Sequence, residues 1–181
     1  MQNRAISLLR GSAPLAWLAA LIATGFVFIA LLGCAVPLIA FAAICALRQH
    51  SRHALLSVAV IWLALESLGF TALHFPLEPS ALGWAAAVGI ALLTATAAAA
   101  MLARHTHGAT RIVTTFAAVL CLYEALLATT TWAVGGSLQA FTPVVLLQVS
   151  ALNALAYAGL VVARAFTAGA VARRSAVVAK V

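Results

Sequence analysis

Residues 11–47 read GSAPLAWLAALIATGFVFIALLGCAVPLIAFAAICAL and contain no charged residue. The hydrocarbon core of a bilayer is about 30 Å thick, and roughly 20 helical residues are needed to cross it. The stretch is therefore long for one membrane-spanning helix and short for two. Whether it crosses once or twice decides the side of the membrane on which every later loop lies.

The positions of the basic residues favour two crossings. With a single span, Arg4 and Arg10 would face the opposite side of the membrane from Arg48. With a hairpin that turns near Gly33 and Pro37, all ten basic residues of the chain fall on one side. Lys and Arg are strongly biased to cytoplasmic loops. The sequence therefore predicts a hairpin of two short helices, with both ends of the chain in the cytoplasm.

The composition of the whole chain indicates that lipid is its main solvent. Of the 181 residues, 66% are hydrophobic and 7% are charged, whereas a soluble domain carries about a quarter charged residues. We therefore predict an all-α, polytopic membrane helix bundle that forms a single domain over 1–181, in a bacterial cytoplasmic (inner) membrane. The six predicted spans are 14–31, 35–51, 54–73, 81–103, 112–134 and 140–163, followed by a basic cytoplasmic tail over 164–181.

The net charge of +7 would raise the question of nucleic-acid binding in a soluble protein. Here the basic residues lie between or beyond the apolar stretches, and no basic module with flanking aromatic residues is present. Trp84 and Trp132 fall near the outer boundary of the predicted bundle and Trp17 near the inner one, as in an aromatic belt. The expected partners are the lipid bilayer and other membrane subunits, with no nucleic acid.

Two glutamates are the strongest candidates for a functional site. Glu66 and Glu124 each lie near the middle of a predicted span, on helices that run in the same direction. A charged carboxylate at the bilayer centre costs on the order of 3 kcal/mol and indicates function by default. Each could titrate a proton, bind a cation or accept a hydrogen bond from a polar substrate. The structural alternative is a protonated side chain that hydrogen-bonds a neighbouring helix.

The last predicted helix carries a second polar group. Gln148, Asn153 and Tyr157 share one broad face, and the last two are separated by one helical turn. Amide side chains in lipid need partners, so this face is expected to point toward other helices or a cavity. With Glu66 and Glu124, these residues form the predicted substrate- or proton-binding site at the membrane midplane. Simple interhelical hydrogen bonding is the alternative.

Other kinds of chemistry find little support. Four histidines lie in two predicted cytoplasmic turns, but arginines there would repel a metal cation, and haem ligation needs imidazoles inside the bundle. The three cysteines form no CxxC pair. The chain has no aspartate and no nucleophile or phosphate-loop motif. We therefore expect neither an enzyme nor a metal site, and the sequence identifies no cofactor.

Two functions remain open from the sequence. The first is a transporter or substrate-capture membrane subunit that uses the polar midplane site. The second is a structural or assembly subunit of a larger membrane complex, in which the polar groups are buried against neighbouring chains. The position of the two glutamates separates them, because a shared cavity favours transport and separate helix contacts favour assembly.

Overall fold

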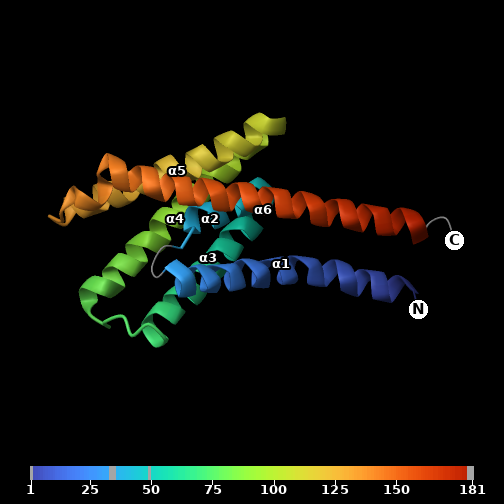
Figure 1. Ribbon diagram of the computed structural model, residues 1–181, viewed down its shortest axis with the longest axis horizontal. Helices are drawn as coiled ribbons and strands as arrows, with labels where there is room; N and C mark the ends of the chain where they lie inside the picture. Colours follow the sequence, from blue (N-terminus) through green and yellow to red (C-terminus); the bar gives the residue numbers. More distant parts are fainter. Residues whose placement is uncertain (1, 33–35, 49, 179–181) are drawn as a thin grey trace.

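The computed structural model describes residues 2–32, 36–48 and 50–178, and side chains over 15–31, 36–47 and 50–167. Its secondary structure over these ranges consists of helices joined by turns and loops, with no strand among them (Figure 1). The helices are α1 (Gln2–Leu32), α2 (Leu38–Arg48), α3 (Ser51–Thr71), α4 (Pro79–His105), α5 (Gly108–Ala133) and α6 (Pro143–Val178), with a short 3-10 helix, η1 (Leu138–Phe141), before α6.

Within the part of the chain that the structure describes, four helices are long and apolar enough to cross a membrane: α3, α4, α5 and the part of α6 up to Thr167. Their outer faces carry large apolar side chains, such as Ile90, Val113 and Leu155, which are 65–74% exposed. So much exposed apolar surface on a monomer marks a membrane or protein contact. The protein is therefore an integral membrane protein with a helical bundle.

Helix α2 forms the centre of the bundle. Every residue from Ile39 to Leu47 is at most 4% exposed, and the helix packs against α3, α4, α5 and α6. A helix that is apolar all round needs such an environment. Its 11 residues give a length of about 16 Å at 1.5 Å per residue, about half of the hydrocarbon thickness.

This short helix differs from the predicted span 35–51. The chain leaves α1 at Leu32 and enters α2 at Leu38, with a buried Pro37 just before it. The helix break therefore lies at the expected turn, although residues 33–35 are outside the described residues. Sequence could not give the length of α2, because apolar residues look the same whether they face lipid or protein. The count of six full spans stays a prediction.

Side chains from two other helices bind the ends of α2. The Asn153 Oδ1 of α6 accepts a hydrogen bond from the Ala40 backbone N–H at 3.1 Å. At the other end, the Arg111 Nη2 of α5 donates to the Leu47 carbonyl oxygen at 2.8 Å. The first N–H and last C=O groups of a helix have no partner within it, and both ends of α2 lie inside the protein. These bonds therefore hold the short helix at a fixed depth.

The basic side chains gather at the end of the bundle where α2 ends and α3 begins, which we call the basic end. Arg104 of α4 donates to the Ser51 hydroxyl there, close to the Arg111 bond to α2. The Arg164 guanidinium of α6 stacks over the Trp17 ring at 5.1 Å and interacts with Cys45 in the last turn of α2. Figure 1 shows the start of α1 and the end of α6 projecting on the same side.

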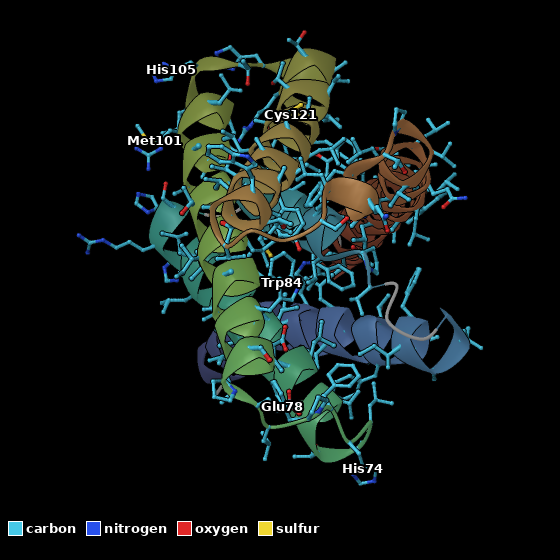
Figure 2. All side chains as sticks on the ribbon, turned by 90° about the vertical axis from the view of Figure 1, so that its left-hand side faces the viewer. His74, Glu78, Trp84, Met101, His105 and Cys121 are labelled. Carbon is cyan, nitrogen blue, oxygen red and sulfur yellow. The ribbon has the colours of Figure 1, made fainter. Side chains whose placement is uncertain are left out.

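The opposite end of α4 carries the turn that joins it to α3. Figure 2 shows His74 and Glu78 there, at the far end of α4 from His105. The turn reverses the chain through His74, whose φ is 55°, and α4 starts at Pro79, a position that suits proline because no N–H partner is needed. We call this end the acidic end, after Glu78.

Candidate functional site

A cavity of about 470 Å³ opens near the acidic end, between the second half of α3, the first half of α4 and the start of α2. Its walls are mostly apolar and aromatic, with one carboxyl group and one phenol. The residues that matter most for its chemistry are Leu38, Glu66, Phe70, Phe75, Trp84 and Tyr123. Trp84 lies on the half of α4 that is nearer Glu78 (Figure 2).

The short length of α2 explains why the bundle is hollow here. Because α2 begins only at Leu38, the part of the bundle beyond its first turn has no central helix. Leu38 lines the cavity, together with Val36 and with Ile29 of α1. The long helices α3 and α4 continue past this level toward the acidic end, so they form walls around space that α2 does not fill.

The aromatic wall of the cavity depends on a close contact at Gly69. A Cβ atom there would lie 2.7 Å from the Phe75 ring, which is shorter than any normal contact. The Phe75 N–H donates to the Gly69 carbonyl oxygen at 3.1 Å, and the Phe75 ring packs edge-on against Phe70 at 6.2 Å. The chain after α3 therefore folds back and places an aromatic ring beside the cavity.

Glu66 provides the only charged group among the described residues that line this cavity. Its side chain is half-buried. The Trp62 indole lies one turn earlier on α3 and interacts with the Glu66 carboxyl. Its Nε1 is buried and makes no hydrogen bond of normal geometry among the described residues. Within the described part of the chain, no cation forms an ion pair with Glu66 or Glu124. Apart from the Trp62 indole, the Glu66 carboxyl therefore has no counter-ion among the described residues that would compete with a ligand in the cavity.

Tyr123 brings the two predicted glutamates into one neighbourhood. It enters the cavity wall from α5, and its hydroxyl is within electrostatic range of both Glu66 and Glu124. Glu124 itself does not line the cavity. Both carboxyls therefore act electrostatically on one phenol, but of the two only Glu66 lines the cavity.

The three predicted residues of α6 lie elsewhere. Asn153, 2% exposed, binds the start of α2 as described above. Tyr157, 5% exposed, donates its hydroxyl to the Ile112 carbonyl oxygen at 3.1 Å and stacks on Phe116. Gln148 lies on the exposed surface of α6. The structure therefore does not bring the five predicted residues into one cavity.

The aromatic part of the site is not evident from the sequence. Tyr123 directly precedes Glu124, and this is the one signal that could have indicated it. Trp84 is 43% exposed and also lines the cavity, which its predicted place in an interfacial belt does not indicate. Phe70 and Phe75 resemble ordinary lipid-facing residues, because a phenylalanine has no polar group to indicate which side it faces.

The described residues contain no group of three or more His, Cys, Asp or Glu side chains that could hold a metal ion. No protein-family model, curated protein or solved structure matches the chain. The fold and the cavity define a class: a helical integral membrane protein with a carboxylate-bearing, aromatic-walled cavity in one half of its bundle.

Proposed function

We propose that this protein is a transporter or a substrate-capture membrane subunit whose ligand occupies the Glu66 cavity. The observation that carries the proposal is the single carboxyl group in an otherwise apolar and aromatic cavity of about 470 Å³. Small-molecule sites have volumes of about 300–1,000 Å³ and are lined by apolar groups with a few polar ones that orient the ligand.

The lining also limits the chemistry of the ligand. A carboxylate pairs best with a cationic or hydrogen-bond-donating group, and Trp84 and Phe70 offer aromatic faces that attract a cation. Tyr123 adds a hydroxyl that donates or accepts. The ligand we infer is small and mainly apolar, with one amine or comparable donor group.

The charge distribution supports a particular orientation in the membrane. Basic residues are retained on the cytoplasmic side, so the basic end would face the cytoplasm together with both ends of the chain. The membrane would then be a bacterial cytoplasmic membrane. α1 and α2 would form the predicted hairpin, with α2 crossing only the cytoplasmic half. The cavity would open toward the acidic end, and therefore toward the outside of the cell.

Native mass spectrometry of the protein purified in its own lipids tests this proposal even though the ligand is unidentified. We expect a retained small molecule on the wild-type protein and on Glu124→Gln, because Glu124 does not line the cavity. We expect its loss from Glu66→Gln. Both variants replace a half-buried carboxyl by an isosteric amide, so Glu124→Gln is a matched control. Equal occupancy in all three proteins, or no retained molecule on the wild type, would contradict the proposal.

One observation favours the alternative, an assembly subunit. Gln148 is exposed on α6, where lipid offers its amide no hydrogen-bond partner. A neighbouring subunit would supply one. The two functions are compatible, since a capture subunit without a nucleotide-binding motif needs a partner to drive transport. If Gln148→Leu leaves a co-purified complex intact, this face of α6 is not the contact.

A further inference from the structure

The basic end contains a second cavity, of about 350 Å³, which is separate from the Glu66 cavity. It is lined by Leu47 at the end of α2 and by Gly108, Arg111 and Ile112 in the first turn of α5. The charged group in this lining is the Arg111 guanidinium. The cavity therefore combines a fixed cation with the beginning of a helix.

The charge of Arg111 has no carboxylate partner in the described part of the chain. Its Nη2 donates to the Leu47 carbonyl oxygen, and its Nε is buried with no hydrogen-bond partner among the described residues. The three acidic residues of the sequence are Glu66, Glu78 and Glu124. Glu124 is 13 residues further along α5, about 20 Å away at 1.5 Å per residue. Glu66 lies 15 residues into α3, and Glu78 is at the acidic end (Figure 2).

The start of α5 adds to this positive potential. His107 precedes the helix with extended backbone and makes no side-chain cap bond, so among the described residues no side chain caps the first N–H groups of α5. Such N–H groups and the helix dipole attract anions. Arg104, fixed by its bond to Ser51, belongs to the preceding helix at the same end.

We propose that this cavity binds a phosphate-bearing anion at the basic end of the bundle. A planar guanidinium matches two phosphate oxygens with two parallel N–H bonds, and the anion would supply the counter-charge that no described residue gives to Arg111. The same chemistry fits two sources, the headgroup of an anionic lipid and free phosphate. Basic pockets at the cytoplasmic ends of membrane helices suit lipid headgroups.

Lipid binding to the delipidated full-length protein in neutral detergent tests the proposal. The probes are phosphatidylglycerol and phosphatidylcholine with the same acyl chains, measured by native mass spectrometry. We expect Arg111→Gln to weaken phosphatidylglycerol binding about tenfold or more, as for the loss of one charge-assisted hydrogen bond. Arg52→Gln removes an equal charge from an exposed side chain of the same end, and we expect less than about a twofold effect.

Competition separates the two sources. If inorganic phosphate displaces phosphatidylglycerol from the wild type, the site takes free phosphate as well; if it does not, the lipid headgroup is the ligand. Both results support the site. Because Arg111 also binds α2, a second variant, Ile112→Trp, fills the cavity while keeping the guanidinium, and we expect it to lose binding too. Equal binding of both lipids to the wild type, or equal losses in Arg111→Gln and Arg52→Gln, would overturn the proposal.

Discussion

The bond between Asn153 and α2 offers a direct way to measure how the bundle is held together. Replacing Asn153 by Ala removes the oxygen that accepts from the Ala40 N–H. The other bond of this side chain, from its Nδ2 to the Val149 carbonyl oxygen at 2.9 Å, lies within α6. Its loss leaves no acceptor without a partner, because this carbonyl oxygen is already bonded in its own helix. The perturbation therefore falls on the first turn of α2.

The size of the effect follows from the burial of that turn. Loss of an N-cap acceptor costs about 1 kcal/mol, and a buried donor left without a partner costs about 1–3 kcal/mol. These two values describe one event and do not add. Interhelical hydrogen bonds in membrane proteins average only about 0.6 kcal/mol, which sets the lower limit. Since Ala40 is 0% exposed, water cannot replace the oxygen, and we expect about 1–2 kcal/mol.

Unfolding in mixed micelles of increasing sodium dodecyl sulfate content measures this free energy. The matched control is Gln148→Ala on the same helix, which removes an exposed amide and should leave the free energy of unfolding of the isolated protein unchanged. If Asn153→Ala is as stable as Gln148→Ala, the Asn153 bond does not hold α2, and our account of its fixed depth is wrong.

Three further substitutions test contacts between the longer helices by the same unfolding assay. A Cβ atom on Gly89 would lie 2.6 Å from the Trp62 ring, whereas one on Gly83 would meet nothing within 4 Å. We expect Gly89→Ala to lower the free energy of unfolding by about 1–3 kcal/mol. We expect Gly83→Ala to leave it unchanged or to raise it by up to about 1 kcal/mol. Equal effects at the two glycines would contradict the close approach of α3 and α4. Tyr157→Phe keeps the ring but removes its bond to the Ile112 carbonyl oxygen, and we expect a loss of about 1 kcal/mol; an unchanged midpoint would show that this bond contributes nothing.

The four long helices could be predicted well from the sequence. The spans expected at 54–73, 81–103 and 112–134 correspond to α3, α4 and α5, because prolines, glycines and arginines interrupt the apolar runs there. The last helix continues past its predicted end at 163 as far as Val178, since a basic segment of Ala and Arg favours helix in water as much as in lipid.

The depth of α2 and the composition of the site could not be predicted in this way. Asn153 points inward, as its amide in an apolar helix predicts, but its partner is a backbone N–H, which no sequence pattern reveals. Glu66 could be identified from the cost of a carboxylate in lipid. Its neighbour Tyr123 could not be identified, because the proximity of Glu66 and Tyr123 depends on how far α3 and α5 are displaced along their axes. Whether Glu66 binds a ligand stays a prediction.

The accessibility of two adjacent alanines of α4 shows whether the Glu66 cavity opens to the outside of the cell. Ala85 lines the Glu66 cavity, whereas Ala86 lies on the exposed outer face of the helix, which lipid would cover. Each is replaced by cysteine in a protein whose native cysteines are changed to alanine. Intact cells are then treated with a membrane-impermeant, cationic methanethiosulfonate reagent. We predict rapid modification of Ala85→Cys, slowed by Glu66→Gln, and little modification of Ala86→Cys. Equal rates at the two positions, or protection of Ala85→Cys alone, would contradict a ligand cavity open to the outside.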